Sequence, residues 1–292
     1  MTTVRELLAG AVERFEAAGL AYGHGTTNAL DEAAWLIQHA LGRNPADIAP
    51  ILDRPLDAAQ AKAVRALVTR RIRTRKPAAY LTNEAWLGAH RFYVDERVIV
   101  PRSYIFELLE HRALPLPPPK AGGHRILDLC TGSGCLAILA ALAFPQAKVD
   151  AADLSPEALE VAKRNVADYK LSRRVRLVRS DLFAALEGRR YDLIITNPPY
   201  VKAASMRTLP EEYRKEPRVA LASGADGLAH ARAILREAGG HPEPEGVLVM
   251  EIGHNRRALE RAFPGTPFRW PDTSGGRGFV FMLRGEELPF QR

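Results

Sequence analysis

The chain has 292 residues, of which 47% are hydrophobic and 26% charged, a composition typical of a soluble globular protein. Its longest apolar run, Cys135 to Phe144, is too short to cross a bilayer, and the first residues lack the apolar stretch of a signal peptide. The two cysteines lie five positions apart, and the eight histidines form no metal-ligand pattern, so we expect a reduced, metal-free protein of the cytoplasm.

The formal net charge is +7. An excess of positive charge favours an acidic partner, most simply nucleic acid or a ribonucleoprotein. An arginine-rich composition would also make a chain basic without any such partner. Charge alone therefore does not separate these two interpretations.

Residues 1–82 have the pattern of a small helical domain. Thr3 and Glu6 form a capping-box pattern ahead of apolar residues that recur on one helix face, and further helices are expected over 28–41 and 57–75. Positive side chains are favourable at a helix C-terminus. The cations that end the third helix therefore indicate a solvated helix end, with an RNA or ribosome contact as the alternative. These cations are Arg70, Arg71, Arg73, Arg75 and Lys76.

Residues 83–100 are expected to form a hairpin. Two short strand-like stretches, 84–88 and 91–100, flank the turn sequence Gly88-Ala89-His90, which predicts a hairpin or two edge strands. The proline-rich segment 114–123 then reads as a spacer between structural units.

From residue 125 onward, strand-like and helix-like segments alternate. This alternation predicts an α/β fold with a mostly parallel sheet that helices cover on both faces. The expected helices are 136–144, 156–169 and 227–238. The expected strands are 126–129, 149–152, 175–178, 193–196 and 247–252, followed by a closing pair at 268–270 and 278–283.

A glycine-rich turn lies between the first of these strands and its helix. Gly132, Gly134 and Ala137 fit the pattern G-x-G-x-x-A, in which glycines let the backbone approach a ligand. Asp153 ends the next strand, where a carboxylate commonly binds a ribose diol. Tight strand–helix packing would also explain the glycines. With the strand, the helix and the strand-end acid together, we expect a nucleoside-cofactor site.

Residues 196–200, "TNPPY", follow the buried strand 193–196, and we call them the acceptor ledge. The two prolines fix φ and remove two backbone donors, which leaves carbonyl acceptors. A loop that only ends a strand is the structural alternative. At the carboxyl edge of a doubly wound sheet the ledge would lie near the glycine turn. A row of acceptors suits a substrate NH₂ group that faces a methyl sulfonium, and this favours S-adenosylmethionine over a dinucleotide.

These motifs resemble those of class I S-adenosylmethionine-dependent methyltransferases, and more narrowly of the protein N5-glutamine methyltransferases. The resemblance rests on "DLCTGSG" (128–134), Asp153, "SDLF" (180–183) and "NPPY" (197–200). "EAWLG", "FYVDERVIVPRS" and "LPEEYRKEPRVALASGADGL" are similar to the PrmB type of this family, which methylates a glutamine of the large-subunit ribosomal protein L-three. The resemblance runs from about Thr27 to the C-terminus.

The resemblance implies a role for each motif residue. The Asn197 Oδ1 and the Pro198 carbonyl would accept the two amide hydrogens of the glutamine, and Tyr200 would pack on the flat amide; a core aromatic is the alternative for Tyr200. The expected catalytic residues are thus Asn197, Pro198 and Tyr200. The expected substrate-binding residues are Asn197, Pro198, Pro199 and Tyr200. The expected cofactor-binding residues are Asp128, Cys130, Thr131, Gly132, Ser133, Gly134, Asp153, Asp181, Leu182 and Asn197, and no metal site is expected.

The family layout implies a doubly wound, mostly parallel seven-stranded sheet with a small N-terminal helical domain. Residues 1–82 would recognise the substrate, 83–100 would be a hairpin linker, and 101–292 would form the S-adenosylmethionine-binding catalytic domain. The expected partners are ribosomal protein L-three or an assembling large ribosomal subunit, with an RNA contact through the basic surface and no membrane. The oligomeric state is not predicted.

Two positions depart from the family pattern. Tyr104 stands where PrmB-type sequences usually have proline. Leu182 stands where release-factor enzymes commonly have a tryptophan near the adenine, so stacking must come from elsewhere. Alternatives to the PrmB type are a release-factor glutamine methyltransferase and an N6-adenine methyltransferase, whose target is also a conjugated NH₂. A ribosome-assembly factor without catalysis is a third, against which the intact Asn197 and Asp153 argue.

Overall fold

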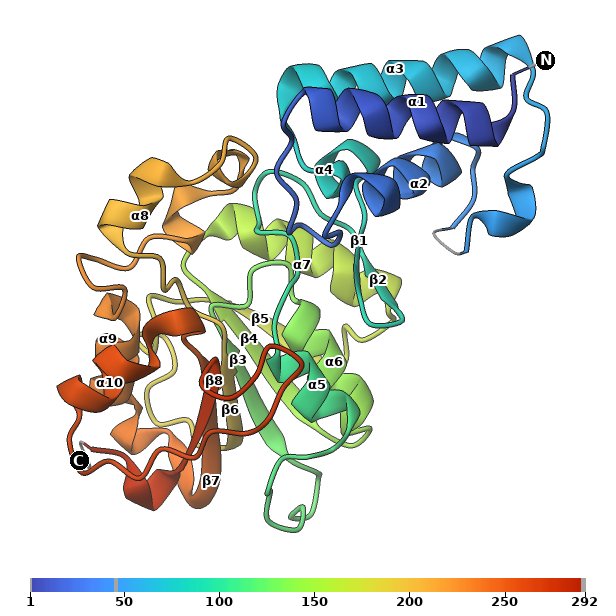
Figure 1. Cartoon of the computed structure of the whole chain (residues 1–292). Helices are drawn as coiled ribbons and strands as arrows, with labels where there is room; N and C mark the ends of the chain where they lie inside the picture. The colour runs from blue at the N-terminus through green and yellow to red at the C-terminus, as the bar shows by residue number, and fades with distance from the viewer. Residues whose placement is uncertain (1, 45–46, 290–292) are drawn as a thin grey trace.

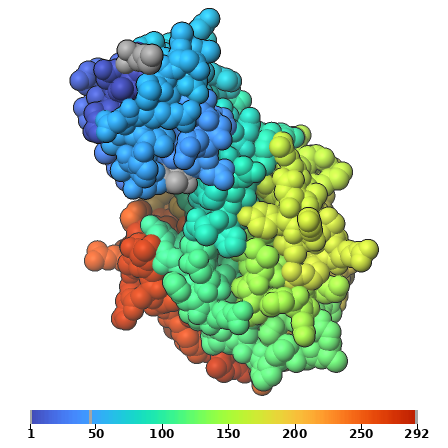
Figure 2. All heavy atoms as spheres, turned by 90° about the vertical axis from the view of Figure 1, so that its right-hand side faces the viewer, coloured from blue at the N-terminus to red at the C-terminus, as the bar shows by residue number. Residues whose placement is uncertain are grey.

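The computed structural model describes residues 2–44 and 47–289. A helical part lies above an α/β part in Figure 1. Figure 2, turned by 90°, shows the two parts packed directly on each other, with the chain that follows the helical part lying between them. Within the described residues, no helix is both long enough and apolar enough to cross a membrane.

Among the described residues, the N-terminal part has four α-helices: α1 (Val4–Ala17), α2 (Ala29–Ala40), α3 (Ala58–Thr74) and α4 (Ala78–Thr82). The predicted capping box of Thr3 and Glu6 is present at the start of α1. A second capping box, of Asp57 and Gln60, begins α3. Both boxes satisfy backbone N–H groups that a helix start leaves without partners.

The apolar core of the helical part extends into the α/β part. The buried faces of α1, α2 and α3 join one cluster with Val94, Val98 and Val100 of the following chain. The same cluster includes Ala158 and Val161 of α7 (Pro156–Asp168). Burial of apolar surface is the main stabilising contribution to folding, so the two parts stabilise each other.

The predicted hairpin is confirmed. Strand β1 (Ala85–Leu87) pairs with β2 (His90–Phe92) in antiparallel register around Gly88, whose φ is 58°. The second strand is shorter than the predicted 91–100, because its pairing with β1 ends at Phe92.

The main sheet has the order β5-β4-β3-β6-β7-β8. All neighbours pair in parallel except β7 and β8, so the mostly parallel, doubly wound arrangement is confirmed. The strands are β3 (Arg125–Leu129), β4 (Lys148–Asp153), β5 (Val175–Arg179), β6 (Tyr191–Thr196), β7 (Pro242–Glu251) and β8 (Val280–Arg284).

The strand count differs from the expected seven. In the part of the chain that the structure describes, the segment expected as a strand at 268–270 contributes one isolated bridge, between Arg269 and Met282. Pro267 and Pro271 flank this bridge, and neither has an N–H group to donate to a ladder. The sheet therefore has six strands.

Helices cover both faces of the sheet, as expected. One apolar layer joins one sheet face to α5 (Ile105–Glu110), α6 (Cys135–Ala143) and part of α7, and a second joins the other face to α9 (Ala229–Glu237) and α10 (Arg256–Ala262). The short helix α8 (Ala203–Thr208) follows the acceptor ledge. The parallel strands all end at the edge that faces the helical part, so their carboxyl ends gather there (Figure 1).

Candidate functional site

The glycine turn is held by a buried carboxylate at its base. Asp128 Oδ2 accepts hydrogen bonds from Thr131 Oγ1 at 2.5 Å and from the Ala137 N–H at 2.9 Å. Its other oxygen, Oδ1, is buried without a hydrogen-bond partner among the described residues. Burial raises the pKa of Asp128 to about 7.

Two glycines are required at this turn for different reasons. Gly132 has φ of 56°, and its N–H donates to Asp153 Oδ2 at 2.8 Å. Gly134 has φ of 79° at the start of α6, where an added Cβ would lie 3.1 Å from the Cβ of Ala162. The glycine turn and the strand-end Asp153 are thereby brought together, as the sequence pattern predicts.

A cavity of about 350 Å³ lies above this turn at the carboxyl edge of the sheet. Two of its wall residues, Leu154 and Val219, are large apolar side chains with exposed fractions of 50% and 59%. Such exposed apolar walls around a few polar groups are typical of small-molecule sites. The wall includes these residues that the sequence pattern singled out: Cys130, Gly132, Asp153, Asp181, Leu182, Asn197 and Pro199.

Four of the expected cofactor-binding residues lie outside the cavity wall. Asp128 and Thr131 bond to each other beneath the turn. Ser133 is buried, and its carbonyl accepts from Asn165 Nδ2 at 2.8 Å. Gly134 packs against α7. In the structure these four shape the turn from behind.

Cys130 and Leu182 have a backbone conformation that L-residues rarely adopt. Their φ angles are 60° and 45°, and both side chains line the cavity. Strained backbone of this kind gathers at functional sites.

The acceptor ledge lies between this cavity and a smaller one of about 130 Å³. Asn197 lines both cavities. Its Nδ2 donates to the Arg102 carbonyl at 3.2 Å, which fixes the side-chain amide. Within the part of the chain that the structure describes, neither Asn197 Oδ1 nor the Pro198 carbonyl accepts a hydrogen bond. The ledge thus presents two acceptors with no protein donor.

Tyr200 is fixed by the last residue of β7 and by the segment that follows it. Its hydroxyl donates to Glu251 Oε1 at 3.3 Å, and its carbonyl accepts from Asn255 Nδ2 at 2.9 Å. The ring lies over Gly253, where an added Cβ would come within 2.8 Å of it. Tyr200 lines the smaller cavity, so its ring is held in the wall beside Asn197.

Glu251 is a buried carboxylate that the sequence pattern did not single out. Its Oε2 accepts from Ser103 Oγ at 2.6 Å and from the Tyr104 N–H at 3.0 Å. Burial raises the pKa of Glu251 to about 7. A proline at position 104 could not donate this second bond. Glu251 lies at the carboxyl end of an apolar strand, as Asp128 and Asp153 do, and this signal was available in the sequence.

The buried Glu216 forms an ion pair with the partly buried Arg102 next to the ledge. Both nitrogens of the Arg102 fork lie 2.6 Å from a Glu216 oxygen, and the Val100 N–H also donates to Glu216 at 2.9 Å. Although burial alone would raise it, the pair with Arg102 lowers the pKa of Glu216 to about 2. His24 Nε2, from the helical part, lies 3.6 Å from Glu216 Oε2, and its ring packs against Tyr213. Residues 114 apart in sequence meet here, and no local pattern could have indicated the contact.

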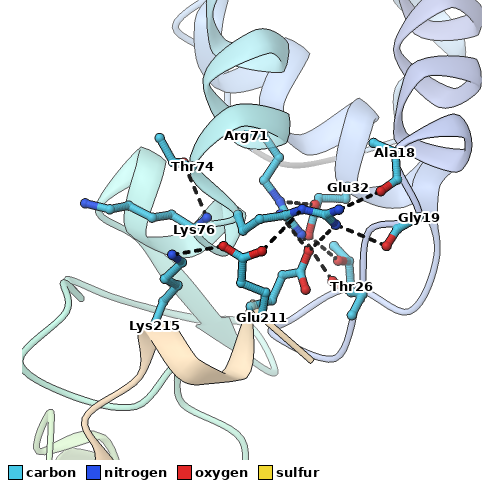
Figure 3. A network of polar contacts seen from close by, with 12 residues as sticks. Ala18, Gly19, Thr26, Glu32, Arg71, Thr74, Lys76, Glu211 and Lys215 are labelled. Carbon is cyan, nitrogen blue, oxygen red and sulfur yellow. Dashed lines mark hydrogen bonds and ion pairs between the residues drawn. The ribbon is translucent and has the colours of Figure 1, made fainter. Parts of the chain in front are cut away.

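The end of α3 holds the loop 209–221, which follows α8 (Figure 3). Arg71 Nε donates to Glu32 at 2.7 Å, and Arg71 Nη1 reaches Glu212 at 3.4 Å. Arg75 Nη1 donates to the same Glu212 oxygen at 3.1 Å. The Tyr213 hydroxyl donates to the Tyr22 carbonyl at 3.2 Å. The loop that supplies Glu216 is therefore attached to the helical part.

The expectation of a solvated helix end is wrong for Arg71. Its side chain is fully buried between Glu32 and Glu212, since these carboxylates compensate its charge. Arg75 is partly buried in the same network, and Lys76 pairs with Glu96. Of the five cations, Arg70 and Arg73 are exposed, as expected.

Comparisons with known proteins agree with this geometry. Residues 113–225 match the family model described as Methyltransferase small domain, and residues 6–82 match the PrmC N-terminal domain. The chain is 54% identical over 288 residues to the ribosomal protein uL3 glutamine methyltransferase of Neisseria meningitidis serogroup B, covering 99% of this chain and 95% of that protein. It is 52% identical over 295 residues to the protein of the same description from Burkholderia pseudomallei, covering 98% and 96%.

One solved structure shares the fold at low sequence identity. The catalytic domain of hMettl16, solved in complex with MAT2A 3'UTR hairpin 1, superimposes with a TM-score of 0.51 at 16% identity, covering 86% of this chain and 89% of that one. The likeness concerns the fold alone.

Proposed function

The chain belongs to the family of ribosomal protein uL3 glutamine methyltransferases and is a methyltransferase, and from this premise we propose that it transfers a methyl group from S-adenosylmethionine to the side-chain amide nitrogen of a glutamine in uL3. The protein uL3 is the one called L-three above. One observation carries the proposal: Asn197, in the wall shared by two adjoining cavities, has a fixed amide whose Oδ1 has no donor among the described residues.

The larger cavity fits the cofactor. Asp153 accepts one backbone N–H on each oxygen, and each oxygen has a further lone pair for a ribose hydroxyl. Leu154, Leu182 and Val219 line this cavity and offer apolar surface against which the adenine would pack. When bound, S-adenosylmethionine supplies a methyl group that its positive sulfur makes electrophilic.

The smaller cavity fits a glutamine side chain. Its wall contains Asn197, Pro198 and Tyr200, together with the aliphatic residues Ile99 and Val201. Asn197 Oδ1 and the Pro198 carbonyl would each accept one hydrogen of the substrate NH₂. Tyr200 would pack on the planar amide. An amide is a poor nucleophile because its lone pair is delocalised, so its orientation toward the larger cavity has a large effect on rate.

The same acceptors have an electrostatic role. Positive charge develops on the amide nitrogen as the new bond forms, and two preorganised oxygens beside it stabilise that charge. The bond from Asn197 Nδ2 to the Arg102 carbonyl keeps Oδ1 aimed without reorganisation. No general base is needed at this position, since the methylated cationic amide loses its proton readily.

We further propose that residues 1–82 recognise the protein substrate and that residues 101–292 carry out catalysis. Residues 83–100 would link these two parts. The match of 6–82 to the PrmC N-terminal domain supports the first assignment. The contacts of His24 and Tyr22 with the loop 209–221 support a recognition surface that continues into the glutamine cavity. Residues 97–99 of the linker also line the cofactor cavity, so the linker would take part in binding.

Methyl transfer to purified uL3 tests the proposal. The full chain is incubated with isotopically labelled S-adenosylmethionine and uL3, and the labelled peptide is sequenced by mass spectrometry. We expect one labelled glutamine and label that resists ribonuclease. Label on adenine, or on a release factor in preference to uL3, would overturn the substrate assignment.

A further inference from the structure

A third cleft lies at the edge of the sheet opposite the two cavities. It has a volume of about 310 Å³ and is surrounded by the first residues of β3, β4, β5 and β6. In Figure 1 this is the edge farther from the N-terminal helices. Strands of this length rise about 3.3 Å per residue, so the cleft lies roughly 15–20 Å from the carboxyl edge.

Positive charge is concentrated in this cleft. Its wall contains six cations and one carboxylate, an excess of five charges, against a net charge of +7 for the whole chain. Five of the six cations are arginines, whose planar forks pair with phosphate oxygens in bidentate fashion. The cations are Arg125, Lys148, Arg173, Arg174, Arg176 and Arg189, and the carboxylate is Asp150.

The single carboxylate gives the cleft a fixed geometry. Asp150 Oδ1 accepts from Arg176 Nε at 2.8 Å, and Oδ2 accepts from Arg189 Nη1 at 3.1 Å and from the Tyr191 hydroxyl at 2.8 Å. Arg174 donates to the Ala141 carbonyl at 2.6 Å. Each guanidinium has five N–H donors, so most donors of these arginines remain for a ligand.

Two cations in the wall have side chains without a polar partner in the described part of the chain. The exposed side chains of Arg125 and Arg173 make no polar contact with another described residue. Like charges repel, and a fold that gathers six of them around one carboxylate loses stability unless an anion binds there.

We propose that this cleft binds the phosphate backbone of RNA. The choice of RNA rests on the proposed function, because a substrate that is a ribosomal protein is found with ribosomal RNA. Tyr191 is buried and its hydroxyl is bonded to Asp150, so the described cleft wall offers no free aromatic ring for stacking on bases. The binding is therefore to backbone phosphates and independent of sequence. Since the cleft and the cavities lie at opposite edges, RNA does not compete with the glutamine.

RNA binding is tested on the full chain by fluorescence anisotropy with a labelled hairpin of about 30 nucleotides, titrated at several salt concentrations. The cleft variant is Arg125→Glu/Arg173→Glu. The matched control is Arg70→Glu/Arg73→Glu, which makes the same charge change at exposed positions of α3. Neither pair touches the cavities or the Asp150 contacts. Melting temperatures are measured to verify that both variants fold.

The cleft variant should bind RNA at least about tenfold more weakly near 100 mM salt, with a salt slope smaller by about one to two units, because about two phosphate contacts are lost. The control should stay within about twofold of the unaltered chain. An equal loss in both variants would show an effect of overall charge and overturn the proposal, as would unchanged binding in the cleft variant. Displacement of the RNA by polyglutamate at equal charge concentration would overturn it in favour of an acidic protein.

Methylation of free uL3 separates this inference from the proposed function. The cleft variant should methylate RNA-free uL3 at the rate of the unaltered chain and should lose RNA binding alone. If the unaltered chain fails to methylate uL3, the proposed function fails, whereas the anisotropy comparison still decides on the cleft.

Discussion

Asn197 has two different polar atoms with two different surroundings. Its Nδ2 donates a hydrogen bond to the Arg102 carbonyl, and its Oδ1 can accept one from a ligand. We predict that Asn197→Ala lowers single-turnover methylation about 10²–10³-fold, because one preorganised acceptor is lost from the transition state. The affinity for S-adenosylmethionine should change little, since Asp153 and the glycine turn remain. Single-turnover kinetics and calorimetric titration of one preparation measure both.

The melting temperature of the same variant distinguishes a structural role. If Asn197 only ends strand β6, its replacement should lower stability and leave the turnover of folded molecules near normal. That result would remove Asn197 from the catalytic site. Asn197→Asp serves as the conservative comparison, because it keeps an oxygen acceptor but introduces a charge and loses the Nδ2 donor to Arg102.

Glu251 gives the ledge a dependence on pH. Its pKa of about 7 lies above the usual carboxyl value because the group is buried, and its oxygens accept from Ser103, Tyr104 and Tyr200. Ionisation strengthens these acceptors and thereby fixes Tyr200. We predict that methylation rises as pH increases through about 7, and that Glu251→Gln, which cannot ionise, loses this rise. Asp128 also has a pKa of about 7, so Asp128→Asn is the control that assigns the inflection.

The stability of the fold should respond to pH in the opposite direction. The folded pKa of Glu251 is raised above its unfolded value, so the folded state holds the proton more tightly. The resulting contribution is fully present below the unfolded pKa and is lost as pH rises through about 7. As pH rises from 5 to 8, Glu251→Gln should therefore gain stability relative to the unaltered chain. This window runs from just above the unfolded pKa of Glu251 to just above its folded pKa. Urea denaturation at pH 5 and pH 8 measures the free energy of unfolding of both proteins. A difference in this free energy that stays the same at the two pH values would refute the prediction.

At the scale of the elements, α3 and the loop 209–221 depend on one buried arginine. Replacing Arg71 by Met leaves Glu32 buried without its cation, and breaking such a pair costs about 3–5 kcal/mol. The pKa of Glu32 is already raised by burial, so the loss should be smaller at low pH, where the carboxyl is protonated. Chemical denaturation of Arg71→Met measures it. Arg73→Met, exposed on the same helix, should stay within about 0.5 kcal/mol. Equal effects of the two changes would contradict a special role for Arg71.

Elements whose signals are local were predictable from the sequence, and those held by distant contacts were not. The glycine turn, Asp153 and the acceptor ledge each follow an apolar strand, so parallel topology alone brings them to one edge. The buried state of Arg71 depends on Glu212, which is 141 residues away, and helix patterning at α3 carries no trace of it. The seventh strand was predicted wrongly although a local signal was present. The prolines at 267 and 271 argue against strand pairing there.

At the scale of the whole molecule, the helical part and the α/β part share a core. Buried residues of α1 to α3 pack in one cluster with Ala158 and Val161 of α7, and the loop 209–221 bonds to both parts. The sequence suggests two units, because its periodicity changes along the chain. The sequence could not indicate that the two parts share one core, because the contact between two packed units has no periodic pattern of its own. The division at residue 82 between substrate recognition and catalysis stays a prediction. The shared core bears only on the stability of the two parts.

We therefore predict that the full chain unfolds in one cooperative transition. The three tryptophans allow a test, because Trp35 and Trp86 belong to the cluster of the helical part and Trp270 packs in the α/β part against Phe281. The variant Trp35→Phe/Trp86→Phe retains only the α/β reporter, and Trp270→Phe retains only the helical reporters. Within each variant, thermal unfolding followed by fluorescence should coincide with unfolding followed by circular dichroism. If the helical reporters change at a lower temperature than the circular dichroism of the same protein, the helical part melts on its own. In that case the shared apolar cluster and the Arg71 contacts contribute too little to couple the two parts.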